Sequence, residues 1–352
     1  MDLTLLPILL LANPSLISPL HTYHALTGRP GYIDCLLLCL GMQIPLSPAV
    51  LNEGEYPACA AMTTGYCFRV ENQATVMYLQ RTGQTGSLVT LEVSSPLQNS
   101  KAPRNKIRNI ARQGLLYLLP TAMLLSCVCG LVLFRGGSRH QLLYSPSPFS
   151  IASISLLLLS RLLSIITLRA RTTSPSSSSS SWHGQSEPGV KGDLLILLSE
   201  DRWIRMKGLV DDLKAVTSGS WLLSRPGLPT YPTILYETMD WIAGLLVYIA
   251  AIVLVNAPNQ DQIIVILYAL LGHGALAMHN ATSSELVMND RRLNVSSQPG
   301  SGVKKYSRRL AMARELVKEM GRSDFAVRLG ILNPDDVDSD SSGKLKSEIV
   351  TM

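Results

Sequence analysis

The chain has 352 residues, of which 47% are hydrophobic and only 16% are charged, whereas charged residues make up about 25% of an ordinary globular domain. Its net charge of +6 comes from Lys and Arg residues that flank apolar stretches. This pattern argues against nucleic acid as a partner and favours membrane lipids. The six cysteines form no CxxC or Cys/His array, which excludes a disulfide scaffold and a zinc site, and no cofactor or metal is expected.

The N-terminal third combines apolar segments with a polar loop region. Residues 1–46 are apolar but interrupted by prolines, and they lack the basic start of a cleaved signal peptide. They either form a membrane hairpin or stay outside the membrane, and their length does not decide between the two. Within residues 47–113, the stretches 66–79 and 87–93 are rich in Val, Thr and aromatic residues and predict a β-hairpin. A basic flank at 101–112 follows.

Four apolar runs have the length and low charge of transmembrane helices. The first pair lies within residues 114–168 and comprises 114–134 and 149–168, and the second pair lies within 236–279. The sequence therefore predicts an all-α integral membrane protein with four transmembrane helices, or six if the N-terminal segment forms a hairpin.

The connecting segments predict the orientation of these spans. A Ser/Pro-rich linker at 169–190 precedes a charged but periodically apolar stretch at 191–222, which predicts one amphipathic interfacial helix. The polar tail at 280–352 contains a second amphipathic helix at 303–329. Since Lys and Arg concentrate before the first span and in the tail, the positive-inside rule places the central helix and the basic tail in the cytosol. The membrane is expected to be the endoplasmic reticulum or another internal membrane.

The predicted central helix carries an apolar stripe. Trp203, Met206, Val210 and Leu213 fall at helical spacing along it. One interpretation is a docking interface for partner proteins or for a lipid-soluble substrate. The other is an elbow helix that packs beneath the bundle and has only a structural role.

Four ionisable residues in or beside the predicted spans are candidate catalytic residues: Arg161, Glu237, Asp240 and His273. A charge within an apolar run costs free energy, so Arg161 is either functional or paired, with Glu237 or Asp240 as the available partners. His273 is either an acid–base group or a hydrogen-bonded packing residue of the last span.

Two further features depend on the side of the membrane on which they lie. Asn280 and Asn294 begin glycosylation sequons, but the predicted orientation places both in the cytosol, where they are unused. Cys59 and Cys67 form a disulfide if their loop is luminal, or remain free thiols if it is not.

Two blocks of the sequence resemble a family of multi-pass membrane proteins of filamentous fungi. They are EPGVKGDLLILLSEDRWIRMKGLVDDLKAVTSGSWL at residues 187–222 and KKYSRRLAMARELVKEMGRSDFAVRLGIL at 304–332. Some members of that family lie in indole-diterpene gene clusters of the paxilline and aflatrem type, and most have no assigned activity. The resemblance covers about residues 149–332 and implies a membrane location and a link to secondary metabolism. It supplies no catalytic residues.

These observations predict an accessory multi-pass membrane protein that is not itself an enzyme. It would support fungal secondary-metabolite (indole-diterpene, paxilline-type mycotoxin) biosynthesis as a scaffold, with membrane lipids and membrane-bound biosynthetic enzymes as partners. One alternative is a membrane-embedded, cyclase-like enzyme acting on a lipid-soluble intermediate. Another is a small transporter, although the four spans show no internal repeat of the kind common in transporters.

Overall fold

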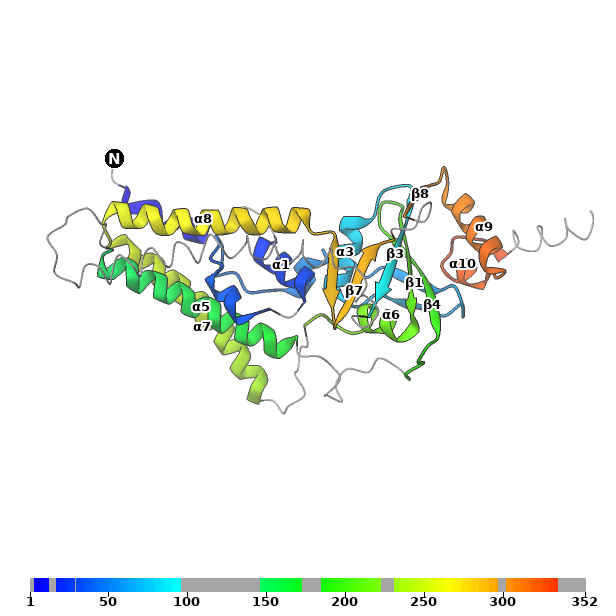
Figure 1. The fold of residues 1–352 in the computed structure, drawn as a ribbon, viewed down its shortest axis with the longest axis horizontal. Coiled ribbons are helices and arrows are strands. Elements are labelled where there is room, and N and C mark those ends of the chain that lie inside the picture. Colours follow the sequence, from blue (N-terminus) through cyan, green and yellow to red (C-terminus); the bar gives the residue numbers. More distant parts are fainter. Residues whose placement is uncertain are drawn as a thin grey trace, which may run out of the picture. The chain divides into compact units, whose positions relative to one another are not determined.

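The chain folds into two structural units that alternate along the sequence (Figure 1). The computed structural model describes residues 3–12, 17–28, 30–95, 146–172, 185–222, 231–296 and 302–334. The sheet unit lies within residues 52–99, 182–221 and 284–352, and the helical unit lies within residues 1–51, 100–181 and 222–283. Each unit is therefore assembled from three separate stretches of chain.

An eight-stranded mixed sheet forms the centre of the sheet unit, so the prediction of an all-α protein is wrong. The strands run in the order β2-β1-β4-β5-β3-β7-β6, and β8 also pairs with β3. Their bounds are β1 Ala58–Ala61, β2 Cys67–Arg69, β3 Ser87–Ser94, β4 Lys191–Leu198, β5 Arg202–Leu209, β6 Glu285–Met288, β7 Arg291–Val295 and β8 Val303–Lys305. The three stretches of the unit contribute β1–β3, β4–β5 and β6–β8 respectively.

Strand β3 joins the three stretches. On one side it runs parallel to β5. On the other side it is antiparallel to β7 along its C-terminal half and to β8 along its N-terminal half. The Thr90 amide donates to the Gly302 carbonyl (2.8 Å), and the Ser296 amide donates to the Thr90 carbonyl (2.9 Å). Strands β7 and β8 therefore continue one another along the same edge of β3.

Residues 191–222, predicted as one amphipathic helix, form β4, β5 and the short helix α6 (Val210–Thr217). Trp203 and Met206 are three residues apart in β5, so they lie on opposite faces of the sheet, and both are buried. A strand that is covered on both faces loses the alternation of apolar and polar residues. Its apolar positions can then coincide with helical spacing, which explains the wrong prediction.

Two tight turns connect the hairpins of the sheet. Glu200 and Asp201, between β4 and β5, have φ of 59° and 52°, and Asn289 and Asp290, between β6 and β7, have φ of 47° and 59°. Asn289 and Asp290 alone separate the paired residues Met288 and Arg291, and positive φ at both is the geometry of the two-residue turn that matches the twist of antiparallel strands. In the β4–β5 turn, three residues separate the paired residues Leu198 and Arg202.

Helix α6 lies against one face of the sheet over a pair of glycines. Gly192 of β4 and Gly208 of β5 are directly opposite each other. A Cβ at Gly192 would crowd Leu213 and Val210 of α6. The absence of side chains at this pair therefore allows the helix to approach the strands closely.

The opposite face of the sheet is covered by α9 (Arg309–Met320) and α10 (Asp324–Arg328). Trp203 of β5 and Phe325 of α10 belong to the same buried cluster. The tail helix predicted at 303–329 is therefore divided into strand β8 and these two helices.

A helix also replaces part of the β-hairpin predicted in the first stretch. Strand β3 forms near the expected residues, but α3 (Gln73–Thr82) takes the place of the partner strand. The side chain of Asn72 caps this helix by accepting a hydrogen bond from the Thr75 amide at 3.1 Å.

Three of the described helices of the helical unit are long and apolar enough to cross a membrane. They are α5 (Pro148–Arg171), α7 (Tyr231–Val255) and α8 (Asn259–Thr282), in the regions of the spans predicted at 149–168 and 236–279. The span predicted at 114–134 lies outside the described residues. The described N-terminal segments are short: η1 Leu3–Leu11, α1 Pro19–Thr27, η2 Tyr32–Leu36 and α2 Pro48–Leu51.

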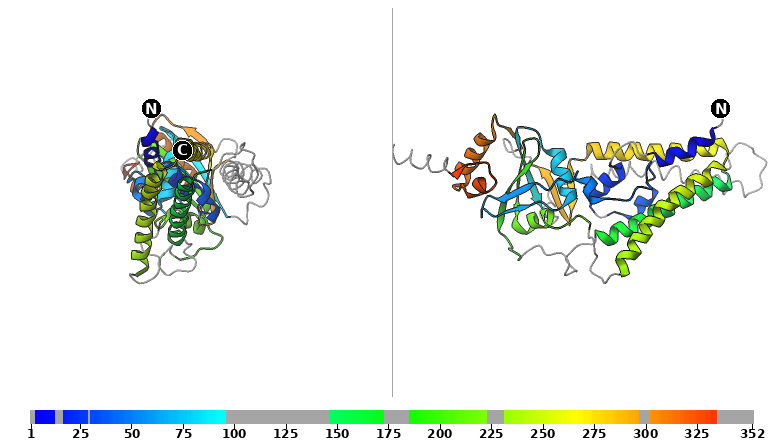
Figure 2. Two further views of the ribbon diagram at one scale, coloured as in Figure 1. Left: turned by 90° about the vertical axis from the view of Figure 1, so that its left-hand side faces the viewer. Right: turned by 180° about the vertical axis from the view of Figure 1, so that it is seen from behind.

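Helices α5 and α7 pack side by side (Figure 2). Two buried serines of α5 donate hydrogen bonds to the backbone of α7: Ser153 to the Ala250 carbonyl at 2.9 Å and Ser160 to the Ala243 carbonyl at 2.6 Å. Small residues and hydroxyl groups at a helix interface permit close approach where the surroundings are apolar.

Two glycines of α8 provide a matched test of packing in the helical unit. A Cβ at Gly272 would overlap the backbone carbonyl of Leu38, whereas a Cβ at Gly274 would meet nothing within 4 Å. We expect Gly272→Ala to lower the free energy of unfolding by about 1–3 kcal/mol, because the backbone of Leu38 must move. Gly274→Ala should be neutral or stabilising by up to about 1 kcal/mol. Thermal unfolding of the purified chain in detergent would measure both, and equal effects would contradict this packing.

Candidate functional site

A polar cavity lies inside the helical unit among α1, residues 42–46, α5 and α7. Its volume is about 50 Å³. A single buried water occupies roughly 10–15 Å³ of such space, so the cavity has room for several waters or for one small polar group. Its polar lining consists of His21, His24, Gln43, Arg161, Ser164, Thr167, Arg171 and Asp240.

Arg161 of α5 is the most enclosed charged group of this lining, with 3% of its surface exposed. Its Nη2 lies 3.3 Å from Nε2 of His24. Because a guanidinium can only donate hydrogen bonds, His24 accepts at Nε2 and is the neutral tautomer with its proton on Nδ1. Within the described residues, Nε of Arg161 and Nδ1 of His24 are buried without a partner. Two N–H donors beside the cavity therefore lack acceptors among the described residues.

Within the described part of the chain, no carboxylate contacts Arg161 directly. None of the ion pairs among the described residues includes it. Asp34 contributes a negative charge nearby, and its carboxylate accepts a hydrogen bond from the Gly31 amide at 2.8 Å. A buried charge without a bonded counter-charge costs several kcal/mol in ordinary proteins, on the order of 3–5 kcal/mol when a pair is broken. This environment is therefore unusual for a residue with only a structural role.

Asp240 of α7 lines the same cavity but is engaged with other groups. It accepts a hydrogen bond from the Thr167 hydroxyl at 2.5 Å, and its Oδ2 lies 3.6 Å from Nη1 of Arg171. The acid predicted as a partner of Arg161 is thus paired with a different arginine of α5.

The other two predicted candidates lie elsewhere. Glu237 is exposed on α7, and His273 is half-buried on α8 with an unpartnered Nδ1. Neither lines the cavity. The structure therefore brings Arg161 and Asp240 together and separates Glu237 and His273 from them.

The sequence reasoning missed the two histidines of α1. His21 and His24 are three residues apart, so they share one face of a helix, and both line the cavity. The motif HTYH, which places two histidines within an otherwise apolar segment, could have identified them as candidate site residues.

The described residues contain no group of three or more His, Cys, Asp or Glu side chains that could hold a metal ion.

Cys59 and Cys67 are both free thiols. Cys59 is opposite Phe68 and Cys67 is opposite Ala60, so the two side chains point to opposite faces of the sheet and cannot form a disulfide. Burial raises the pKa of the Cys59 thiol well above its usual range, which makes it unreactive.

The four residues predicted as a docking interface do not form one exposed surface. Trp203 and Met206 are buried in β5, and Leu213 is buried in α6. Val210, at the start of α6, is only partly exposed. Their apolar side chains stabilise the fold of the sheet unit.

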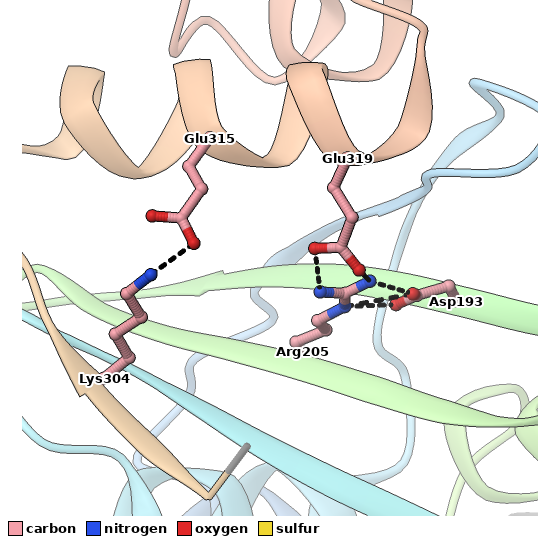
Figure 3. Close-up of polar contacts among 5 residues, drawn as sticks. All are labelled: Asp193, Arg205, Lys304, Glu315 and Glu319. Atoms are coloured by element: carbon pink, nitrogen blue, oxygen red, sulfur yellow. Dashed lines mark hydrogen bonds and ion pairs between the residues drawn. The ribbon is translucent and has the colours of Figure 1, made fainter. Parts of the chain in front are cut away.

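The sheet unit contains a second buried arginine, and this one is fully paired (Figure 3). Arg205 of β5 donates to Asp193 of β4 at 2.6–3.1 Å and to Glu319 of α9 at 2.7 Å through both terminal nitrogens. Its side chain is 8% exposed, against 12% for Asp193 and 47% for Glu319. The guanidinium thus joins two strands to the helix that covers them.

The electrostatics of this network fit a structural role. Burial disfavours the charge of Arg205, but the hydrogen bonds that it donates to Glu319 and Asp193 outweigh this effect and raise the pKa of the guanidinium. The hydrogen bond from Arg205 in turn lowers the pKa of Glu319. Lys304 of β8 forms an ion pair with Glu315, one turn earlier on α9 (Figure 3). Together these contacts fix α9 on the sheet.

The two sequons are partly or wholly enclosed by the fold. Asn280 is buried, and its side-chain amide donates to the Pro19 carbonyl at 2.6 Å. Asn294 lies in β7 between two paired strands, with its Oδ1 buried. The absence of a glycan at Asn280 would therefore not report the side of the membrane.

The fold and the cavity define a mixed α/β protein with three helices that are able to cross a membrane. Comparisons with protein-family models, curated proteins and solved structures found no significant match to this chain.

The Arg205 network generates a prediction about the stability of the sheet unit. Arg205→Leu leaves the buried Asp193 without its counter-charge, which should lower the free energy of unfolding by about 3–5 kcal/mol. Glu319→Gln should cost no more than about 1 kcal/mol, because that carboxylate is half exposed to solvent. Amide hydrogen exchange of α9 peptides in the full-length protein would measure the loss. If both variants exchanged like the wild type, the network would not hold the helix.

The lowered pKa of Glu319 predicts a loss of stability in acid. A carboxyl whose pKa is lower in the folded state stabilises that state above its unfolded pKa of about 4.5, and the contribution is lost as pH falls through the folded value. Burial raises the pKa of Asp193 against the pull of Arg205, which contributes with the opposite sign. The difference in unfolding free energy between wild type and Glu319→Gln isolates the first effect. It should shrink as pH falls below the unfolded value and the folded carboxyl becomes protonated, and a constant difference across this range would contradict the prediction.

Proposed function

We propose that this chain is a multi-pass membrane protein that supports fungal secondary-metabolite biosynthesis of the indole-diterpene, paxilline type at an internal membrane such as the endoplasmic reticulum. It acts as an accessory protein without catalytic activity. Its helices anchor it in the lipid, and its sheet unit offers a surface to membrane-bound biosynthetic enzymes in the cytosol.

The observation that carries this proposal is the interleaving of the two units. Strands from three stretches of chain form one hydrogen-bonded sheet, and the helices that are able to cross a membrane lie between those stretches. Unpaired strand edges are not tolerated in hydrocarbon. The three stretches therefore share one side of the membrane, and the chain crosses an even number of times between them.

The helices satisfy this condition. Helices α7 and α8 provide two crossings between the second and third stretches. The sequence-predicted span 114–134, outside the described residues, would provide an even number together with α5. The basic residues at 101–112 and in the tail favour the cytosol as the shared side.

The charged side chains of the sheet unit support an accessory role. Several of its arginines and lysines pair with carboxylates that hold strands and helices together, as in the pairs Arg205–Asp193, Arg205–Glu319, Arg291–Asp212 and Lys214–Glu187. Groups engaged in this way stabilise the fold and are not free for proton transfer. The link to secondary metabolism is supported by the resemblance of the blocks at 187–222 and 304–332 to the fungal family described above.

One observation favours a second candidate, a membrane-embedded enzyme acting on a lipid-soluble intermediate. Asp240 lines the same cavity as His21, His24 and Arg161, so an acid and two imidazoles converge on one space. A cyclase-like reaction would use Asp240 as the proton donor.

Deletion of the gene tests the proposal, with metabolites measured in cells and in medium. We expect an intermediate to accumulate. Expression of Asp240→Asn should restore the product as fully as wild type, with Glu237→Gln as an exposed control on the same helix. Loss of product with Asp240→Asn at normal protein abundance would favour the enzyme. Finished product retained in cells would favour a transporter, and an unchanged profile would refute the link to this metabolism.

A further inference from the structure

The cavity of the helical unit carries an excess of positive charge. Its lining contains two arginines, Arg161 and Arg171, and one carboxylate, Asp240. Asp240 is occupied by Arg171 and the Thr167 hydroxyl. Arg161 forms no ion pair among the described residues, although Asp34 contributes a negative charge nearby.

The unpartnered groups of Arg161 and His24 are hydrogen-bond donors, and the lining also contains one unpartnered acceptor, Oε1 of Gln43. The guanidinium of Arg161 has five N–H donors, and within the described residues its only hydrogen-bond contact is with His24. His24 uses its acceptor nitrogen for that contact and leaves a donor at Nδ1. A ligand group beside Arg161 and His24 must therefore accept hydrogen bonds, and one that also carries negative charge would offset the buried cation.

The size of the cavity limits the part of a ligand that fits. Its volume of about 50 Å³ is enough for a few water molecules. A carboxylate or a phosphate group matches this size, whereas a complete terpenoid or acyl chain does not. Any apolar portion of the ligand would have to lie outside the cavity, against the apolar surfaces of the helices.

We propose that the cavity beside Arg161 binds the anionic head, a carboxylate or phosphate group, of a small molecule or lipid. The guanidinium supplies the charge and the fork of donors, and His24 holds it in place through Nε2. The lipid form of the inference rests on the proposed membrane location, because a lipid head group is available only if the helices lie in lipid, whereas a soluble anion does not require it. The inference does not depend on the link to secondary metabolism.

The competing interpretation is a water-filled structural cavity. Several waters would satisfy the donors of Arg161 and His24 without any ligand. In that case added anions would not stabilise the protein, and removal of the charge would change only the basal stability.

Thermal unfolding of the full-length protein in lipid nanodiscs distinguishes these interpretations. The wild type would be measured in phosphatidylcholine alone, with phosphatidic acid in the bilayer, and with inorganic phosphate or acetate in the buffer. We expect an anion to raise the melting temperature in proportion to the logarithm of its concentration above the dissociation constant. Stabilisation by phosphatidic acid alone identifies a lipid head group as the source, and stabilisation by phosphate or acetate identifies a soluble anion.

Two variants of α5 provide the matched comparison. Arg161→Gln removes the charge from the cavity and should abolish the anion-dependent rise. Arg169→Gln removes the same charge from the same helix, but Arg169 does not line the cavity and instead stacks over Tyr32, so this variant should respond like the wild type. The proposal is overturned if no anion stabilises the wild type, or if the two variants respond alike.

A second measurement covers the case in which Arg161→Gln fails to fold. Native mass spectrometry of the wild type, released from nanodiscs that contain phosphatidic acid, should detect one retained anionic lipid per chain above the level seen for phosphatidylcholine. Retention of neither lipid, together with no response to phosphate or acetate, would overturn the proposal. Anion binding with an unchanged metabolite profile would leave this inference standing and refute only the biosynthetic role.

Discussion

The pairing of β3 with β5 on one side and with β7 and β8 on the other is the constraint on which the rest of the structure depends. It joins three stretches of chain that are far apart in sequence into one sheet. Because a hydrogen-bonded sheet cannot be divided by a bilayer, this pairing also restricts every intervening segment. In the proposed membrane location, the helices between the stretches must return to the side from which they left.

Two buried arginines, one in each unit, have different roles because their partners differ. Arg205 meets two carboxylates in bidentate geometry and fixes α9 on the sheet. Arg161 meets a neutral histidine and an open cavity. A paired guanidinium stabilises the fold through directed bonds, whereas an unpaired one retains free donors. The difference in partners separates a structural site from a candidate binding site.

The sequence predicted the long helices well, because an uncharged run of about twenty residues has few alternatives. It misled in residues 191–222, where Trp203 and Met206 face opposite sides of a doubly covered strand and imitate helical spacing. The tight turns were readable in principle, since Asn289-Asp290 follows a short apolar strand and favours positive φ. The pairing of β3 with β7 could not be predicted, because the two strands are nearly two hundred residues apart and no local sequence pattern identifies such a partner.

The candidate site was predicted in part. Arg161 and Asp240 were identified because charges in apolar runs are costly. Their actual partners, Arg171 for Asp240 and His24 for Arg161, depend on which face of each helix meets its neighbour. The contribution of α1 could not be foreseen, because its segment was too short and too broken by proline to be placed.

The late position of β7 in the chain has a consequence for biosynthesis. Between the end of β3 and the start of β7 the ribosome adds about 200 residues, which takes on the order of 10–40 s at roughly 5–20 residues per second. Throughout that interval one edge of β3 has no strand to pair with. A newly made chain is therefore exposed to edge-to-edge association with its neighbours on the same polysome, and a chaperone that covers strand edges would increase the yield of folded protein.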